Sequence, residues 1–214
     1  MAASAINRLD MQLQEYFDQL APTWDKEFTP DRLKCLGNIV KGLGIKPGYY
    51  VLDIGSGTGV LLPFLVSEVG DQGRIVALDF SADMLIQAQT KNFPPVVGVA
   101  QADVLAIPLS DSSMDLALCN SAFPHFGDQA RALQEIARVL RSNGRLVICH
   151  TMSREMLNRF HQSIGGIVAH DLLPDETQLR KLIKQAGLTV THFEDGSERY
   201  LVIAEKNLKL RARD

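Results

Sequence analysis

The sequence predicts an α/β protein with a doubly wound, mostly parallel sheet of seven strands that ends in an antiparallel hairpin. Two observations support this fold class. Short apolar runs at residues 49–54, 74–78, 96–101, 114–119 and 144–149 alternate with segments of helical periodicity, which is the pattern of parallel strands joined by crossover helices. Two further runs, at 188–193 and 199–206, flank the turn sequence EDGS and predict the hairpin.

Start and stop signals place the helices between these strands. Helices over about 5–20 and 31–43 precede the first strand, and Pro22 separates them. Further helices are expected over about 60–69, 82–91, 128–140 and 175–186, with Ser81 as an N-cap and Gly187 as a stop signal. We therefore expect a single domain over residues 1–214, in which residues 1–45 form a helical lid and residues 46–214 form the core.

Composition narrows the class of protein. A chain of 214 residues with 46% hydrophobic and 22% charged residues suits one globular domain. Its net charge of −3 leaves no basic surplus for a phosphate backbone, so we expect no nucleic-acid partner. No apolar run approaches the roughly 20 residues that span a bilayer, which argues against stable membrane insertion. The first residues lack the features of an export signal, so the cytoplasm is the expected location.

The three cysteines, Cys35, Cys119 and Cys149, are too few and too scattered for a disulfide framework or a Cys-x-x-Cys zinc site. Cys119 and Cys149 end two predicted strands, where two thiols are able to bind a soft metal. Buried, inert cysteines are the commoner case. We therefore expect no metal site.

Polar residues at the ends of the predicted strands mark a candidate ligand site. In an open parallel sheet, ligands bind beyond the carboxyl ends of the strands, and Asp53, Asp79, Asp103 and Asn120 end the first four. A carboxylate in the position of Asp79 is suited to accept both hydroxyl protons of a ribose, and Asp103 is suited to an exocyclic amine. Each acid alone is as readily a helix cap or turn residue, so the inference depends on their combination.

The loop after the first strand reads GSGTG at residues 55–59. Glycines at alternate positions allow the backbone to approach a ligand closely, and the helix that follows directs N–H groups at an anion. Nicotinamide-binding loops read Gly-x-Gly-x-x-Gly, whereas here the third glycine comes one residue early and Val60 takes the sixth position. The loop therefore favours a different nucleoside cofactor.

These motifs resemble those of the class I S-adenosylmethionine-dependent methyltransferases, which have a Rossmann-like fold. The likeness covers VLDIGSGTG at 51–59, LDFS at 78–81, QAD at 101–103, IPL at 107–109 and RVLRSNGRL at 138–146. Within this class the chain most resembles the branch that includes the ubiquinone and menaquinone biosynthesis C-methyltransferases, down to YFDQLAPTWD at 16–25. Asn143 stands where that branch usually has a second glycine, and we expect a shifted turn there because Asn tolerates left-handed geometry.

The resemblance implies that the cofactor is S-adenosylmethionine. It places Asp53 and the glycine loop around the methionine moiety, Asp79 on the ribose, Asp103 and the Val104 backbone on the adenine, and Asn120 beside the sulfonium. The cofactor-binding residues expected in this way are Asp53, Gly55, Ser56, Gly57, Thr58, Gly59, Asp79, Phe80, Met84, Asp103, Val104 and Asn120.

Histidines after strands four and five are the candidates for the acceptor side. His125 follows strand four and is suited to proton removal or acceptor binding, although a loop histidine without a chemical role fits equally. His150, Arg154, Asn158 and His161 are spaced so that they share one face if residues 151–162 form a helix. That face either lines an acceptor pocket or is solvated. We therefore name His125, His150, Arg154 and His161 as candidate catalytic residues, expected to converge on one cavity.

Two further groups of residues each have two candidate roles. His170 and Asp171, after Gly165 and Gly166, either reach the same pocket or form a turn before a helix. The aromatic residues Tyr16, Phe17 and Trp24 form either a lid or a packing contact with the sheet.

The expected function is transfer of a methyl group from S-adenosylmethionine to a small-molecule acceptor by in-line displacement, in a monomer or a homodimer. The first alternative is a non-catalytic nucleoside-binding subunit, because a fold alone does not fix a function. The second is a protein or nucleic-acid methyltransferase. The intact loop with both carboxylates disfavours the first, and the acidic balance and the lack of a base-flipping motif after strand four disfavour the second.

Overall fold

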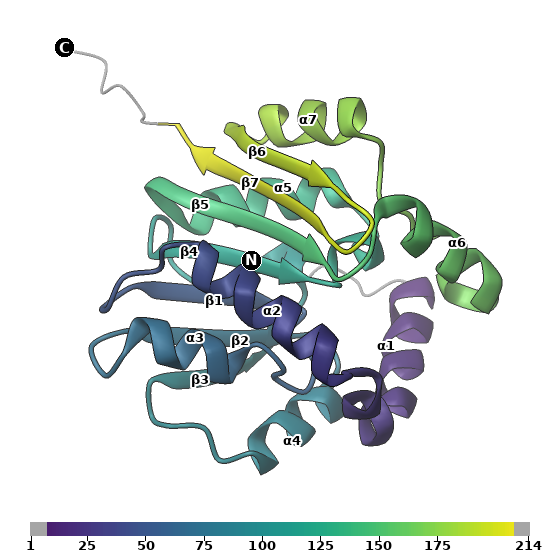
Figure 1. The fold of residues 1–214 in the computed structure, drawn as a ribbon, viewed down its shortest axis with the longest axis horizontal. Helices are drawn as coiled ribbons and strands as arrows, with labels where there is room; N and C mark the ends of the chain where they lie inside the picture. Colours follow the sequence, from purple (N-terminus) through teal and green to yellow (C-terminus); the bar gives the residue numbers. More distant parts are fainter. Residues whose placement is uncertain (1–7, 208–214) are drawn as a thin grey trace.

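The computed structural model describes residues 8–207 and confirms the predicted fold class. A seven-stranded sheet has the order β3-β2-β1-β4-β5-β7-β6 (Figure 1). Residues 5–7 of the predicted first helix lie outside the described residues. The strands are β1 (Tyr50–Ile54), β2 (Arg74–Asp79), β3 (Val97–Gln101), β4 (Met114–Asn120), β5 (Leu140–His150), β6 (Leu188–Asp195) and β7 (Tyr200–Lys206).

Strands β1 to β5 are parallel, and the predicted hairpin completes the sheet. β1 lies between β2 and β4, so Asp53 pairs with Ala77 on one side and Leu118 on the other. β7 runs antiparallel to both β5 and β6 and lies between them. The hairpin therefore enters the sheet with its second strand, and β6 becomes the edge.

Helices cover both faces of the sheet because its strands are apolar on both sides. On one face, α2 (Pro30–Gly42) and α3 (Leu62–Val69) pack with alternate residues such as Leu116 and Leu118 of β4. On the other, α5 (Gln129–Val139) and α7 (Glu176–Gln185) pack with Ala117 and Cys119 of the same strand. This alternation has the period of two that a doubly wound sheet requires.

Three helices lie near the carboxyl ends of the strands. Figure 1 shows α1 (Arg8–Leu20) and α6 (Arg154–Ile164) at the side toward which the arrowheads of β4 and β5 point. The 3₁₀ helix η1 (Ala21–Glu27) continues α1, and both contact α4 (Ala82–Thr90). In this N-terminal part, α1 and η1 lie near the carboxyl edge of the sheet, whereas α2 belongs to a helical layer on the sheet face.

Some boundaries differ from those expected. α3 begins at Leu62 rather than at residue 60, and β5 begins at Leu140, four residues before the predicted start at residue 144. Asn143 has a φ of 63°, which matches the left-handed geometry expected there. A register shift between Met114 and Leu116 accompanies this early start of β5. Ser81 caps α4 as predicted, since its hydroxyl accepts a hydrogen bond from the Met84 amide.

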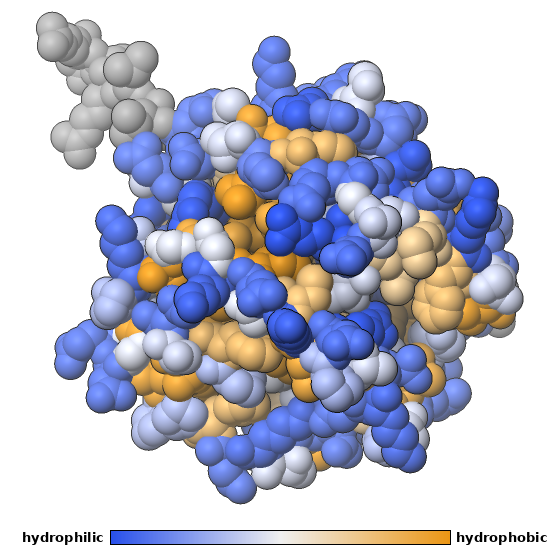
Figure 2. Space-filling model, in the orientation of Figure 1, coloured by the Kyte–Doolittle hydropathy of each residue, from blue (hydrophilic) through white to orange (hydrophobic). Residues whose placement is uncertain are grey.

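Large apolar side chains remain exposed on α6. Met156, Phe160 and Ile164 lie four residues apart and are each about half exposed. In the space-filling view, apolar side chains gather on the right of the face shown, where Figure 1 places α6 (Figure 2). None of the helices in residues 8–207 has the length and apolar character that crossing a membrane requires.

Candidate active site

A cleft opens at the carboxyl ends of β1, β2 and β4 and encloses about 1020 Å³, its open mouth included. Its position is the one expected for a ligand site in an open parallel sheet. Most of the predicted site residues line it: Asp53, Gly55, Ser56, Gly57, Asp79, Phe80, Met84, Asp103, Val104, Asn120 and His125. The remaining predicted residues, Thr58, Gly59, His150, Arg154 and His161, are not among its lining residues.

The glycine loop lies against neighbouring segments, and at Gly55 there is no room for a side chain. Gly55 has a φ of 65°, and a Cβ there would lie 2.4 Å from the Cβ of Ala122. Gly57, with a φ of 53°, lies below the indole of Trp24, whose Nε1 would be 3.5 Å from an added Cβ. The loop therefore exposes bare backbone to the cleft, which is a cradle suited to a polar ligand.

The carboxylate of Asp79 is held by backbone amides. The Gly57 amide donates to Oδ2 over 2.7 Å, and the Ser81 amide donates to Oδ1 over 2.9 Å. Burial raises the pKa of Asp79, and backbone hydrogen bonds from Ser81, Gly57 and Phe80 oppose that rise. A carboxylate has about four lone-pair sites, so Asp79 retains capacity to accept from a ligand hydroxyl.

Asp53 and Ser56 carry buried polar atoms that have no partner among the described residues. These atoms are Oδ2 of Asp53 and Oγ of Ser56, and both residues line the cleft. Burial, followed by the charge of Asp79, raises the pKa of Asp53 to about 7. Unpaired buried polar groups are costly, so this end of the cleft is suited to a ligand that donates hydrogen bonds or carries positive charge.

The part of the cleft that is lined by residues following β2 and β3 is mostly apolar. Phe80, Met84 and Val104 line it, and Asp103 stands exposed at its mouth. Oδ1 of Asp103 accepts a hydrogen bond from the Leu105 amide and so caps the short helix η2 (Val104–Ala106). The apolar surfaces are suited to the faces of an aromatic base, and the acid is suited to an amine at its edge.

The N-terminal segment is tied to the rim of this cleft. Phe17 of α1 packs edge-on against Phe80, with ring centroids 5.8 Å apart, and Asp18 accepts hydrogen bonds from the Ser81 hydroxyl and the Asp83 amide. Phe17 and Trp24 also line the cleft. Phe17 and Trp24 thus pack against neighbouring aromatic rings and also line the cleft. These are the two roles between which the sequence did not decide.

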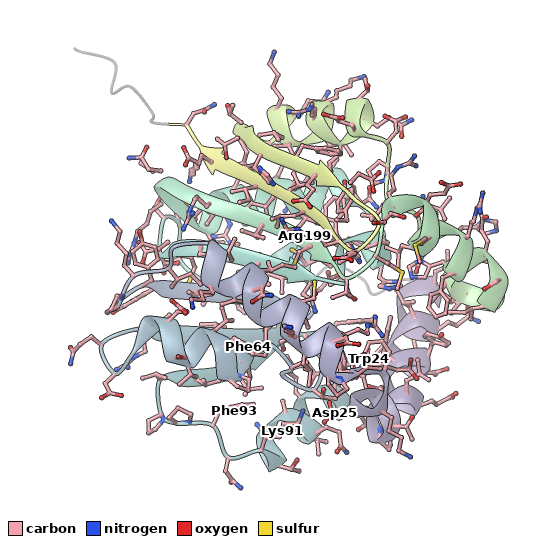
Figure 3. All side chains as sticks on the ribbon, in the orientation of Figure 1. Trp24, Asp25, Phe64, Lys91, Phe93 and Arg199 are labelled. Carbon is pink, nitrogen blue, oxygen red and sulfur yellow. The ribbon has the colours of Figure 1, made fainter. Side chains whose placement is uncertain are left out.

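A second tie runs through Asp25 of η1. Its Oδ1 accepts a hydrogen bond from the Thr58 hydroxyl, and its Oδ2 pairs with Lys91 over 2.7 Å (Figure 3). The hydroxyl of Thr58 therefore holds η1 instead of facing the cleft. Sequence reasoning assigned no role to Asp18 or Asp25, because their partners are 33 or more residues away and no local spacing marks them.

His125 follows β4, which lies on the other side of β1 from β2, the strand that ends at Asp79. It ends the short helix η3 (Phe123–His125), and its ring packs edge-on against Phe17 with centroids 5.0 Å apart. Its Nδ1 lies 2.7 Å from Oδ2 of Asp171. The sequence left open whether Asp171 reaches this pocket, and the structure places its carboxylate beside the cleft histidine.

The polar face of α6 divides into residues that approach the cleft and residues that do not. The ring centroid of His161 lies 4.9 Å from that of His125, and its Nδ1 donates to the Asp171 carbonyl. Asn158 makes two hydrogen bonds to the backbone of Leu173. Asn158 thus holds the segment at 171–173, so it belongs to neither an acceptor-lining nor a solvated face.

Arg154 and His150 belong neither to the lining of the cleft nor to the ring contact between His125 and His161. The backbone amide of Arg154 donates to Asp195 over 2.9 Å, and its Nε lies 3.7 Å from that carboxylate at the β6–β7 turn. His150 is fully buried, and neither ring nitrogen has a partner among the described residues. Burial lowers the pKa of His150 to about 3, so its ring is neutral at physiological pH. The expected convergence of all four side chains on one cavity is therefore only partial.

The two cysteines at the strand ends are buried. The Sγ of Cys149 donates to Oδ1 of Asn120, and burial raises the pKa of both Cys119 and Cys149. Both thiols are therefore protonated at physiological pH. Within residues 8–207, no group of three or more His, Cys, Asp or Glu side chains is arranged to hold a metal ion.

Comparison with known proteins agrees with this geometry. Residues 52–148 match the family model described as a methyltransferase domain. The chain is 33% identical over 170 residues to the demethylmenaquinone methyltransferase of Corynebacterium kroppenstedtii, covering 69% of this chain and 71% of that protein. The chain belongs to the class I S-adenosylmethionine-dependent methyltransferases. The methyl donor that this family uses is S-adenosylmethionine.

Other similar proteins extend the comparison. The 2-phytyl-1,4-naphtoquinone methyltransferase of Trichormus variabilis is 31% identical to this methyltransferase over 164 residues, which cover 71% of this chain and 70% of that protein. An uncharacterized 37.1 kDa protein in transposon TN4556 of Streptomyces fradiae is 38% identical over 136 residues, although the match spans 37% of its length. The crystal structure of a SAM-dependent methyltransferase from Aquifex aeolicus has the same fold, with a TM-score of 0.70, 24% identity, and coverage of 90% and 98% of the two chains.

Proposed function

We propose that the enzyme binds S-adenosylmethionine between the glycine loop and α4 and methylates a small organic acceptor that enters beside His125. The observation that carries this proposal is the pair of unpartnered buried oxygens, on Asp53 and Ser56, next to a bare glycine backbone. A site with such groups is incomplete without a polar ligand. The ammonium and carboxylate of a methionine moiety supply the missing donors and acceptors.

The other residues of the cleft fit the rest of the cofactor. The carboxylate of Asp79 lines the cleft and is suited to accept from the ribose hydroxyls. Phe80, Met84 and the Val104 backbone surround the adenine, with Asp103 at its amine, and Asn120 lies beside the sulfonium. Gly55, Gly57 and Gly59 allow close approach, and Thr58 acts indirectly by holding Asp25.

The bound cofactor supplies a methyl group that is already electrophilic. The chain itself must then hold the acceptor in line with that methyl group and exclude water, and such positioning is worth several kcal/mol of the barrier. Phe17, Trp24 and Phe126 line the cleft with apolar surface that excludes water. His125 and His161 stand on the acceptor side, and the contributions of His150 and Arg154 stay predictions.

A small acceptor fits the surroundings of the cleft better than a polymer does. Hydrogen bonds of Asp18 and Asp25 hold α1 and η1 at the rim of the cleft, where these helices limit the access of a polymer. The net charge of −3 disfavours such a partner as well. Two relatives are named as methyltransferases of demethylmenaquinone and of a phytyl-naphthoquinone, so a hydroxylated aromatic ring is the acceptor class that we test first.

Substitution of Asp79 tests the cofactor site. Asp79→Asn keeps the side-chain shape but removes the charge and one pair of acceptor sites, so the affinity for S-adenosylhomocysteine should fall by about 1–3 kcal/mol. Titration calorimetry on folded protein measures the change, and Asp111→Asn, at an exposed carboxylate before β4, is the matched control. Unchanged affinity in a folded Asp79→Asn protein, or tighter binding of NAD than of S-adenosylhomocysteine, would contradict the proposal.

A further inference from the structure

The acceptor end of the cleft contains a histidine and a carboxylate in direct contact. His125 lines the cleft, and its Nδ1 lies 2.7 Å from Oδ2 of Asp171. The side chains are only 13% and 21% exposed, so water screens the contact weakly. We propose that His125 and Asp171 form a general-base pair and that the acceptor carries an acidic hydroxyl group, as phenols and enols do. This inference rests on the proposed function.

The contact fixes which ring nitrogen carries the proton. A carboxylate can only accept, so Nδ1 of His125 must donate, and the neutral ring then carries its lone pair on Nε2. No partner within residues 8–207 occupies that Nε2. An imidazole held in this tautomer by a carboxylate has one nitrogen ready to accept a proton from a molecule in the cleft.

Asp171 is itself held in place by two neighbouring segments. Its carbonyl accepts a hydrogen bond from Nδ1 of His161, and its amide donates to the Val168 carbonyl over 3.1 Å. Asn158 fixes the next turn of the chain through Leu173. These bonds anchor the carboxylate to α6, so it meets His125 with little freedom.

The groups around the pair fit a proton acceptor. The charge of Asp171 reaches Tyr16 of α1, where it adds to burial in raising the pKa of that phenol. The ring of His161 lies 4.9 Å from that of His125, centroid to centroid, and a charge on His125 reaches the buried ring of His150. Burial lowers the pKa of both His161 and His150. Asp171 is thus the nearest charge to a His125 ring that gains a proton, and it stabilises the resulting imidazolium.

The acceptor hydroxyl transfers its proton to Nε2 of His125, and the electron pair released makes the oxygen, or a ring carbon conjugated with it, the nucleophile. The nucleophile bonds to the methyl carbon while the carbon–sulfur bond breaks with its electron pair going to sulfur. His125 then releases the proton to water. Asp171 keeps its charge throughout and acts as a positioning residue.

Two aromatic acceptors of similar size separate proton removal from simple damage to the site. 1,4-Dihydroxynaphthalene must lose a proton, whereas naphthalene-2-thiol in mildly alkaline buffer is already a thiolate. Asp171→Asn and His125→Gln should each lower turnover of the hydroxyl acceptor at least about tenfold. Turnover of the thiolate should change by less than about twofold, because its reaction does not need the base.

Mass spectrometry of the methylated products gives both rates, and Asp111→Asn is the control. Equal losses on both acceptors would mean that Asp171 only supports the structure, and no loss on either would remove the pair from the reaction. A wild-type enzyme that binds S-adenosylhomocysteine but methylates neither compound would contradict the acceptor class. Failure to bind S-adenosylhomocysteine would instead contradict the proposed function.

Nitrogen-15 NMR of the histidine rings supplies a readout that is independent of activity. In the wild-type protein, His125 should show the tautomer with the proton on Nδ1. In Asp171→Asn this preference should weaken, while His161, bound to a backbone carbonyl, keeps its own pattern. A His125 ring that carries its proton on Nε2 in the neutral wild-type protein would overturn the inference.

Discussion

The two ends of the cleft are built in different ways. At the end beside β1 and β2, most polar groups come from two short stretches, residues 53–59 and 79–81, and backbone amides hold the carboxylate of Asp79. At the end beside His125, they come from η3, α6 and the segment at 171–173, and side chains hold them. The contact between His125 and Asp171 spans 46 residues of sequence, whereas that between Gly57 and Asp79 joins consecutive strands.

This difference shows why one end suits a constant ligand and the other a variable one. Backbone amides and glycines stay in place as long as the strands keep their order, so the cofactor end depends on the fold itself. Side chains on α6 and in the 166–173 segment can be exchanged without disturbing the sheet. We therefore expect this enzyme and its relatives to differ most at the proposed acceptor end.

The largest effect is expected at the unpaired carboxyl of Asp53. Its pKa in the folded protein is raised to about 7 from 3.8, so folding takes up a proton between these pH values and stability falls as the pH rises through them. Without cofactor, the free energy of unfolding of the wild type should fall relative to that of Asp53→Asn by about 4 kcal/mol across this window. Urea unfolding at several pH values measures the difference. If the free energies of unfolding of the two proteins change in parallel with pH, the pKa of Asp53 is not raised in the folded protein.

A smaller effect is expected from filling the glycine cradle. Gly55→Ala and Gly44→Ala both place a side chain at a φ near 60°, but only the first meets an obstacle, the Cβ of Ala122 at 2.4 Å. Both should lose about 1–2 kcal/mol to backbone strain, and Gly55→Ala about 1–3 kcal/mol more to overpacking. Thermal unfolding compares the two variants, and equal losses would mean that the loop and the β4 segment move apart freely.

The smallest effect is expected at the acceptor end. Asn158→Ala removes two partly buried hydrogen bonds to Leu173 and should lower the free energy of unfolding by about 1–2 kcal/mol. The affinity for S-adenosylhomocysteine should not change, because Asn158 holds the segment at 171–173, beside His125, and not the residues proposed to bind the cofactor. Gln162→Ala, at an exposed position of the same helix, is the control. Weaker cofactor binding in Asn158→Ala would show that the two ends are coupled.

The sequence predicted those parts of the structure in which chemistry follows local spacing. Strand ends, the glycine loop and the Ser81 cap each depend on residues close together in the chain, and the structure places Asp53, Gly57 and Asp79 in one cleft as expected. The predicted hairpin is present, but the placement of its second strand, β7, between β5 and β6 could not be predicted from periodicity, because either strand of a hairpin can pair with the sheet.

The parts that the sequence could not fix depend on tertiary contacts. The spacing of Arg154, Asn158 and His161 correctly indicated one helix but not what it faces, and Arg154 lies with Asp195 while Asn158 lies with Leu173. Asp171 stood in a loop that was equally consistent with a turn. Its meeting with His125 follows from how α6 packs, which no pattern along the chain reports.

The position of β7 has a consequence for how the sheet is completed. During synthesis, residues 188–195 leave the ribosome before residues 200–206, so β6 has no partner and β5 keeps an open edge until the later strand emerges. An open edge is a template for pairing with other chains. β7 closes that edge at Cys149 and His150, opposite Leu201 and Tyr200. A chain that stops before Tyr200 would thus expose an aggregation-prone strand beside the cleft, even though every residue proposed to contact the cofactor had already been made.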